Sequence, residues 1–225
     1  MTPELVVLDM AGTTIHDGDA VNRCLSDALH AEGVTVHRDE VNAYMGLPKP
    51  VAIQRLLEQR AENAHRERVM RIHADFQARM IDHYRHSPEV RPVAGTEDAL
   101  RQLKTAGIRV ALDTGFDRQI ADVILRRLQW GPELLDTTVT SDEVPRGRPH
   151  PDLILTAMHR TGVTDPRRVA KVGDTPADLQ EGHAAGCGWV IGVTGGSHTC
   201  AELEPYPHTH LIHSVAELPE ILIRS

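Results

Sequence analysis

A reactive carboxylate is the first chemical feature of this sequence. The stretch from Leu5 to Thr14 reads "LVVLDMAGTT", in which an apolar run leads Asp9 into a small turn that contains Gly12. Enzymes with a parallel sheet often keep a reactive carboxylate in such a turn. Ala11 stands two positions after Asp9, where a second carboxylate would complete a nucleophile and general-acid pair. The stretch therefore predicts chemistry that needs one carboxylate and not two.

Polar residues follow apolar runs at three further places, within "DTG", "GRPHP" and "VGDTPAD". The residues with chemical potential there are Thr114, Gly115, Arg148, Asp174 and Asp178. A threonine hydroxyl beside a glycine can hold a phosphoryl oxygen, and an arginine offers a planar fork of donors for such oxygens. The two aspartates are oxygen ligands of the kind that Mg²⁺ prefers.

Buried parallel strands are the elements that would bring these groups together. Short runs rich in β-branched residues recur as "LVVLDM", "IRVALDTG", "TTVTSDEV", "RVAKVGDT", "GWVIGVTG" and "HLIHSV", and amphipathic segments separate most of them. Runs that are apolar nearly throughout are typical of parallel strands covered by helices on both faces. Because the carboxyl ends of such strands meet at one edge of the sheet, we expect Asp9, Thr114, Ser141 and Asp174 to converge on one crevice.

The strand pattern is interrupted after the first strand. From residue 18 to 87 the sequence shows helical periodicity and no strand-like run. We therefore predict an α/β protein with a Rossmann-like parallel sheet, built from residues 1–17 and 88–225, and an inserted α-helical cap at 18–87. A helical module inserted at this point would lie above the crevice and could act as a lid.

Composition limits the classes of partner. The formal charge of -8 repels a phosphate backbone, and the few aromatic residues, 3% of the chain, provide no set of rings for base stacking. The apolar runs are far shorter than the ~20 residues of a membrane span, and the N-terminus lacks a basic segment followed by an apolar one. We therefore expect a cytoplasmic protein that binds a small molecule, and neither nucleic acid nor membrane. A homodimer is one assembly compatible with the sequence.

Cysteine and histidine give little support for a structural metal. The three cysteines, Cys24, Cys187 and Cys200, are widely spaced and are expected to be reduced. The segment "PHTHLIH" groups three histidines that could chelate a metal, at positions 208, 210 and 213. Alternation along a short strand is the simpler interpretation of that group.

Taken in order, the four polar groups resemble the motifs of the haloacid dehalogenase superfamily, and the resemblance covers the whole chain. It implies that Asp9 attacks phosphorus and forms an aspartyl-phosphate. A carboxylate needs a nearby cation to approach a phosphoryl dianion, and Mg²⁺ is the implied cofactor. The implied ligands are Asp9, the backbone carbonyl of Ala11 and Asp174, while Asp178 is expected to orient Asp174 or the water of the metal.

The third motif of the superfamily usually contains lysine, and here the family pattern places Arg148 in that position. Arg146 is the rival candidate, but "GRP" matches the pattern at Arg148. The resemblance implies that Arg148 and Thr114 hold the phosphoryl oxygens. Gly115 is expected to let the backbone approach the substrate closely.

Ala11 has a specific meaning within this superfamily. Its phosphatases carry an Asp there, which protonates the departing alkoxide. The phosphonoacetaldehyde hydrolases (phosphonatases) instead carry D-x-A-G-T-T together with an arginine in the third motif, and this chain is similar to them in both respects. The resemblance implies cleavage of the C–P bond of phosphonoacetaldehyde or a related 2-oxoalkylphosphonate, with Ala11, Gly12, Met45 and Gly115 in contact with the substrate.

Phosphonatases also carry a cap lysine in M-G-L-x-K, and "YMGLPKPVAI" places Lys49 there. That lysine forms a Schiff base with the aldehyde, so that the departing carbon leaves as an enamine. Lys49 must lose a proton to attack, and burial under a closed lid would lower its pKa from ~10.4. A surface lysine in a turn, between Pro48 and Pro50, is the alternative interpretation.

The chain departs from phosphonatases at Ala52, where they have a histidine that handles protons, and at Phe116, where they have tyrosine. The segment after "VIGVTGGS" is also shorter than theirs. These departures indicate a phosphonatase-like branch. A phosphatase acting on a small phosphate ester is the alternative function, and a non-catalytic binding protein would explain the four motifs poorly.

Overall fold

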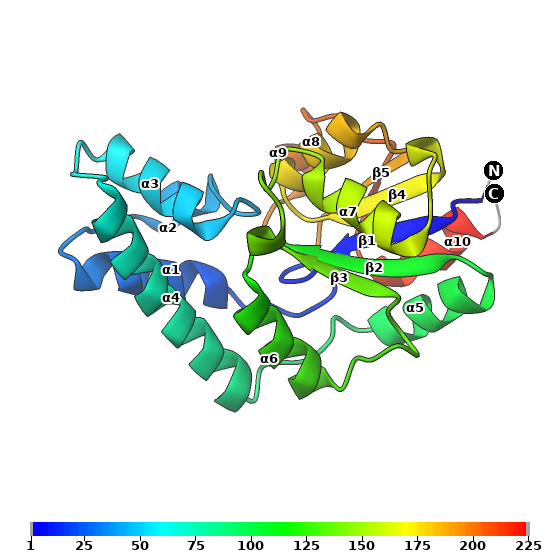
Figure 1. The fold of residues 1–225 in the computed structure, drawn as a ribbon, viewed down its shortest axis with the longest axis horizontal. Coiled ribbons are helices and arrows are strands. Elements are labelled where there is room, and N and C mark those ends of the chain that lie inside the picture. Colours follow the sequence, from blue (N-terminus) through cyan, green and yellow to red (C-terminus); the bar gives the residue numbers. More distant parts are fainter. Residues whose placement is uncertain (1, 224–225) are drawn as a thin grey trace.

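A six-stranded parallel sheet forms the centre of the computed structural model, which describes residues 2–223 (Figure 1). Its strands are β1 (Leu5–Asp9), β2 (Arg109–Thr114), β3 (Thr137–Thr140), β4 (Val169–Gly173), β5 (Trp189–Val193) and β6 (His210–Ile212). They are ordered β3-β2-β1-β4-β5-β6, and every neighbouring pair is parallel. The predicted Rossmann-like fold is confirmed, with β1 between β2 and β4.

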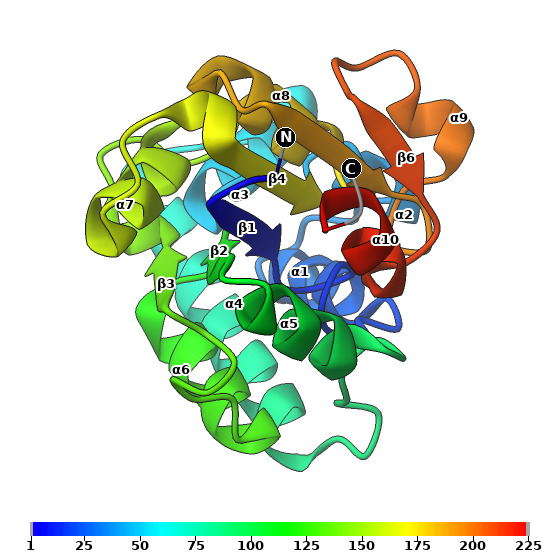
Figure 2. The same cartoon turned by 90° about the vertical axis from the view of Figure 1, so that its right-hand side faces the viewer.

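Helices cover both faces of the sheet, as the apolar character of the strands requires. On one face, Leu5 and Val7 pack with α7 (Asp152–Thr161), and α8 (Pro176–Ala185) lies on β4 and β5. On the other face lie α5 (Thr96–Thr105) and α10 (Leu218–Leu222) (Figure 2). In the register of β1 with β2, Asp9 is paired with Asp113, so both carboxylates leave the sheet at the same edge.

Four helices occupy the interval from Gly18 to His86, and this described stretch contains no strand. They are α1 (Ala20–Ala31), α2 (Arg38–Asn42), α3 (Lys49–Gln59) and α4 (Arg66–His86). Figure 1 shows them together at one end of the molecule, where α4 packs against α6 (Arg118–Leu128). The division into a core of 1–17 and 88–225 and a cap of 18–87 stays a prediction.

One expected strand end is placed differently. β3 stops at Thr140, and Ser141 begins a 3-10 turn over Ser141–Glu143. The Ser141 hydroxyl donates to the Phe116 carbonyl at 3.0 Å, and Ser141 lies outside the cavity described below. The expected convergence of Ser141 with Asp9 on one crevice was therefore wrong: Ser141 instead joins the end of β3 to the loop after β2.

The remaining features concern membrane-spanning helices, cysteines and histidines. Between residues 2 and 223, no helix combines the length and the apolar character needed to cross a lipid bilayer. All three cysteines are free. The three histidines of "PHTHLIH" are exposed around β6, and within the described chain they belong to no group that could hold a metal. The short helix α9 (Cys200–Leu203) precedes that strand.

Candidate active site

A cavity of about 250 Å³ lies at the carboxyl ends of β1 and β2, beneath the helical segment. Eight of the predicted site residues line it: Asp9, Ala11, Gly12, Met45, Lys49, Thr114, Gly115 and Arg148. The other two, Asp174 and Asp178, are fully buried and lie behind this wall. The Thr114 hydroxyl accepts the Phe116 amide N–H at 3.1 Å, which fixes it at the cavity wall.

Close packing and two threonines hold the turn after Asp9. Gly12 has φ +90°, and a Cβ there would lie 2.4 Å from Oδ2 of Asp174, so only glycine fits. The Thr13 hydroxyl donates to Oδ1 of Asp174 at 2.9 Å, and the Thr14 hydroxyl donates to the Asp9 carbonyl at 2.9 Å. The "AGTT" sequence thus fastens the end of β1 to the end of β4.

Asp174 is a buried carboxylate that receives hydrogen bonds from neutral donors. Besides Thr13, its partners are the Ser197 amide and the Ser197 hydroxyl, both at 2.7 Å from Oδ2. Burial raises the pKa of Asp174, and the charge of Asp178 raises it further. Both effects disfavour the ionised form of Asp174, and a positive charge placed beside it would stabilise that form.

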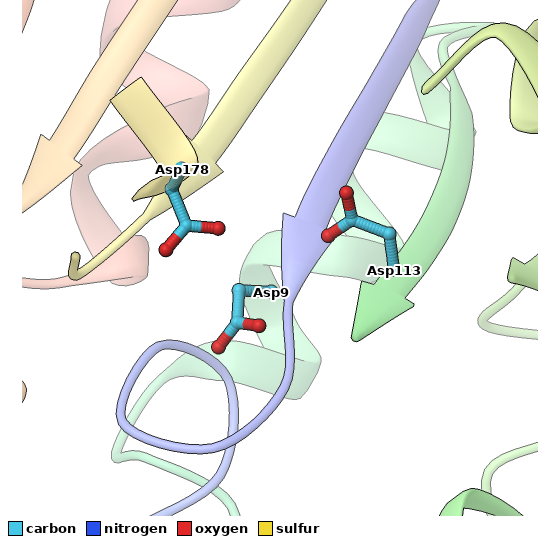
Figure 3. Close-up of side chains that lie close together, drawn as sticks. All are labelled: Asp9, Asp113 and Asp178. Atoms are coloured by element: carbon cyan, nitrogen blue, oxygen red, sulfur yellow. The ribbon is translucent and has the colours of Figure 1, made fainter. Parts of the chain in front are cut away.

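Asp9 has a similar electrostatic problem. Burial raises its pKa to about 8, against the lowering effect of Arg148, and the nearby charges of Asp178 and Asp174 also act to raise it. Figure 3 shows the carboxylate of Asp9, from the end of β1, beside that of Asp113, from β2, and that of Asp178, from the first turn of α8. One oxygen of each carboxylate lies within 4.8 Å of the others. Crowding of this kind favours a bound cation.

Two buried carboxylates, Asp9 and Asp174, have the chemistry to hold a divalent cation. Asp113 is already neutralised: burial acts to raise its pKa, but Arg148 and Lys171 lower it to about 2. Asp9 keeps a raised pKa despite its contact with Arg148, and Asp174 receives its hydrogen bonds from neutral donors, so a cation would relieve both; with the Ala11 carbonyl they would form a set of hard oxygen ligands for Mg²⁺. Bound there, the ion would supply positive charge to a phosphoryl group.

Arg148 contacts the carboxylate of Asp9 directly. Its Nη1 donates to Oδ1 of Asp9 at 2.6 Å, and the Arg148 side chain is almost completely buried. Arg146, the rival candidate, is exposed and pairs with Asp152 at 3.1 Å outside the cavity. The geometry therefore favours Arg148, and it adds a contact with the Asp9 carboxylate to the expected contact with phosphoryl oxygens.

Three buried charged residues around Arg148 were not selected from the sequence: Asp113, Lys171 and Glu181. All three side chains are inaccessible to solvent. A charged residue in the middle of an apolar strand, as in "VAKVG", was the available signal, because lysine is almost never fully buried without a partner.

Asp17 is a further carboxylate in the cavity wall that was not selected from the sequence. Burial raises the pKa of Asp17 to about 6.

Lys49 is the first residue of α3 and is only 4% exposed. Its ammonium lies 5.5 Å from the ring centre of Phe116 and 5.9 Å from that of Phe76. Burial lowers the pKa of Lys49 to about 8, although the charge of Asp9 acts in the opposite direction. The surface-lysine interpretation was wrong, since Lys49 faces the same cavity as Asp9.

Two glycines in loops after the strands, Gly115 and Gly147, let the loop before Lys49 pack closely against them. A Cβ on Gly115 would lie 2.8 Å from the Leu47 carbonyl, and a Cβ on Gly147 would lie 2.3 Å from Cγ of Pro48. Gly115 was expected to give the substrate room, and in this structure it gives room to Leu47. These contacts fix where Lys49 enters the cavity.

The lowered pKa of Lys49 predicts that its charge costs stability. We expect Lys49→Met to increase the free energy of unfolding by ~1–3 kcal/mol at pH 7, because the folded state then buries no ammonium. The pKa of about 8 lies below the value of 10.5 in the unfolded chain, so the cost is complete below pH 8 and fades between pH 8 and 10.5. Urea unfolding from pH 6 to 10 measures this difference.

Lys104→Met is the matched control, because Lys104 pairs with Asp136 at 3.0 Å near the surface. It should change stability by less than about 1 kcal/mol, in either direction, with little dependence on pH. A Lys49→Met protein that is less stable than wild type at pH 7 would show that the ammonium is well accommodated.

Sequence comparison identifies the relatives of the chain. A family model described as haloacid dehalogenase-like hydrolase matches residues 6–192. Phosphonoacetaldehyde hydrolase from Bacteroides fragilis is 29% identical over 235 residues, which cover 98% of this chain and 88% of that protein.

Solved structures show the same fold at low sequence identity. A phosphonoacetaldehyde hydrolase-like protein from Oleispira antarctica has a TM-score of 0.88 and 22% identity, covering 100% of this chain and 92% of its own. A predicted phosphoglycolate phosphatase from Haemophilus somnus has a TM-score of 0.80 and 20% identity, with 97% of each chain covered. Because both phosphonate and phosphate names occur, these likenesses show the fold alone.

Proposed function

The chain belongs to the haloacid dehalogenase-like hydrolases, and on that premise we propose that it is a phosphonatase-like enzyme of the cytoplasm. It cleaves the C–P bond of phosphonoacetaldehyde or a related 2-oxoalkylphosphonate and requires Mg²⁺. The observation that carries this proposal is Lys49, a buried amine with a lowered pKa in the same cavity as Asp9. Ala11 supports it, since no acid stands where an alkoxide would need one.

The first half of the reaction uses Lys49. With a pKa of about 8, about a tenth of this lysine is the neutral amine at pH 7, far more than for a lysine with its ordinary pKa. The amine attacks the carbonyl carbon of the substrate, and loss of water gives a protonated imine. Asp17 lines the cavity with a pKa of about 6, so it can exchange the protons of imine formation. It would take the role of the phosphonatase histidine, since position 52 is alanine here.

The second half uses Asp9. An oxygen of Asp9 attacks phosphorus, the C–P bond breaks, and its electron pair enters the imine to give an enamine. Arg148 holds the attacking carboxylate through the contact of 2.6 Å with Oδ1. Water then hydrolyses the aspartyl-phosphate to phosphate, while protonation and hydrolysis of the enamine release the product aldehyde and regenerate Lys49.

A phosphatase acting on a small phosphate ester is the second candidate function. Asp17 is the observation that favours it, because a carboxyl group with a pKa of about 6 in the cavity could protonate a departing alkoxide. In that reaction Lys49 would bind the substrate without forming an imine.

Phosphate release from a substrate panel separates the two functions. We expect phosphonoacetaldehyde or its ketone homologue to be cleaved at least about 100-fold faster than small phosphate esters, because the cavity lacks an acid at position 11. Chelation with EDTA should stop phosphate release, and added Mg²⁺ should restore it. Rapid hydrolysis of esters with no cleavage of any phosphonate would select the phosphatase.

A further inference from the structure

Three carboxylate oxygens near Asp9 each contact two cations. Arg148 and Lys171 are those cations, and the oxygens are Oδ1 of Asp113, Oδ1 of Asp178 and Oε2 of Glu181. From Lys171 Nζ the three distances are 2.5, 3.0 and 3.0 Å, in that order. From the guanidinium nitrogens of Arg148 they are 2.5, 3.2 and 3.1 Å. We call these five side chains the charge cage.

The charge cage determines which way Arg148 points. Nε donates to Glu181 and Nη2 donates to Asp113, while Nη1 lies 3.2 Å from Oδ1 of Asp178 as an ion pair. The remaining contact of Nη1, at 2.6 Å, is with Oδ1 of Asp9. A planar guanidinium hydrogen-bonded through two of its nitrogens has little freedom to rotate, so the cage directs Nη1 at Asp9.

Lys171 keeps the three carboxylates close together. One oxygen of Asp113 lies within 4.8 Å of oxygens of both Asp178 and Asp9, and such like charges repel strongly inside a protein. With Arg148 alone, one cation would face all of them. Lys171 contacts both oxygens of Asp113, at 2.5 and 2.6 Å, and so supplies a second cation that offsets this repulsion.

The fold alone gives no reason for a lysine in this position. Lys171 lies in the middle of β4, paired with Val7 of β1 and Val190 of β5, where an apolar side chain would satisfy the packing. Gly182 of α8 makes room for a side chain at position 171 of whatever type, since a Cβ on Gly182 would lie 2.9 Å from Cβ of Lys171. A buried charge at such a site indicates a task beyond stability.

We propose that Lys171 is a positioning residue, which holds Asp113, Asp178 and Glu181 in the arrangement that directs Arg148 onto Asp9. The proposal rests on the proposed role of Asp9 as nucleophile. It concerns the phosphoryl-transfer half of the reaction and not the imine at Lys49.

Lys171→Met tests this role, since methionine keeps an unbranched side chain and removes the charge. We expect kcat for phosphate release to fall about 100-fold and KM to change by less than about 3-fold, because a misdirected Arg148 disturbs the attacking group more than substrate binding. The double variant Asp113→Asn with Lys171→Met removes one charge of each sign, and we expect it to recover at least about 10-fold in kcat. Lys104→Met, which removes a lysine paired with Asp136 at the surface, is the control and should keep wild-type kcat.

Borohydride trapping at Lys49 separates a positioning role of Lys171 from a general loss of structure. A loss of structure would abolish trapping, whereas a misdirected Arg148 would leave it unchanged. The Lys171→Met protein, incubated with phosphonoacetaldehyde and borohydride, should still be modified at Lys49 at nearly the wild-type rate. If wild type is not trapped but hydrolyses an ester, the Schiff-base function fails, and the kcat values of the same variants on that ester test Lys171 independently.

Two results would overturn the positioning role. One is a Lys171→Met protein with wild-type kcat. The other is a double variant that folds but is no more active than the single one. If Lys171→Met does not fold, the double variant and Glu181→Gln replace it as the test. We expect Glu181→Gln to lower kcat about 3- to 10-fold. A Glu181→Gln protein with wild-type kcat, together with a folded double variant that has no activity, would reject the proposed role of the charge cage.

Discussion

Replacing Asp9 by Asn is expected to lower phosphate release by at least about 10⁴-fold while the protein stays folded. The amide has nearly the volume of the carboxylate but is not a nucleophile towards phosphorus. Burial raises the pKa of Asp9 to about 8, so its charge costs folding energy, and Asn removes that cost. Steady-state phosphate release and urea unfolding measure the two effects.

Asp98→Asn is the matched control, because Asp98 is highly exposed on α5 and pairs with Arg101 at 3.2 Å. It should keep wild-type activity, and both variants should unfold within about 2 kcal/mol of wild type. Quenching wild type during turnover should leave a phosphoryl group on Asp9, which mass spectrometry detects. An Asp9→Asn protein that retains a tenth of the activity would remove Asp9 from the chemistry.

The strands near the site could be predicted because β1 and β2 are short, largely apolar runs that end in a polar residue. That pattern located β1 and β2 and hence the placement of Asp9 and Thr114 at one edge of the sheet. It could not exclude Ser141 from that edge, since a hydroxyl that binds a nearby carbonyl has the same sequence appearance as one that faces a cavity. Local pattern therefore predicts where a strand ends, but not what the last side chain contacts.

The charge cage could not be derived in the same way, because it depends on which strands are neighbours. Asp113 and Lys171 are separated by 58 positions in the sequence and meet only because β2 and β4 flank β1. Periodicity gives the number of strands but not their order. Lys171 within an apolar run was a visible anomaly, and a buried partner of opposite charge was its physical implication.

The pocket lysine could be located from the sequence only through the resemblance of "YMGLPKPVAI" to a family motif. Residue type and the flanking prolines fit a surface turn equally well. Burial of Lys49 depends on Phe76 and Phe116, which come from α4 and from the loop after β2. Such packing between distant segments is not contained in a local sequence pattern.

Lys49→Arg is expected to lower C–P cleavage by at least about 10³-fold, because a guanidinium cannot form an imine with the substrate. The variant keeps a positive charge in the cavity, so a lysine that only binds the phosphonate would be replaced with a much smaller loss. In wild type, borohydride added with phosphonoacetaldehyde should inactivate the enzyme and leave a reduced adduct on Lys49. Peptide mass spectrometry locates that adduct.

Lys104→Arg is the control for general effects of the exchange, since Lys104 lies at the surface and pairs with Asp136. It should be inactivated by borohydride at the wild-type rate. The absence of histidine at Ala52 is compatible with slow imine formation, so a low but lysine-dependent rate would still agree with the mechanism. If Lys49 stays unmodified and Lys49→Arg keeps full activity on the best substrate, the electron pair of the breaking bond has another acceptor. Asp9 would then transfer the phosphoryl group from an oxygen leaving group, with Asp17 as the acid.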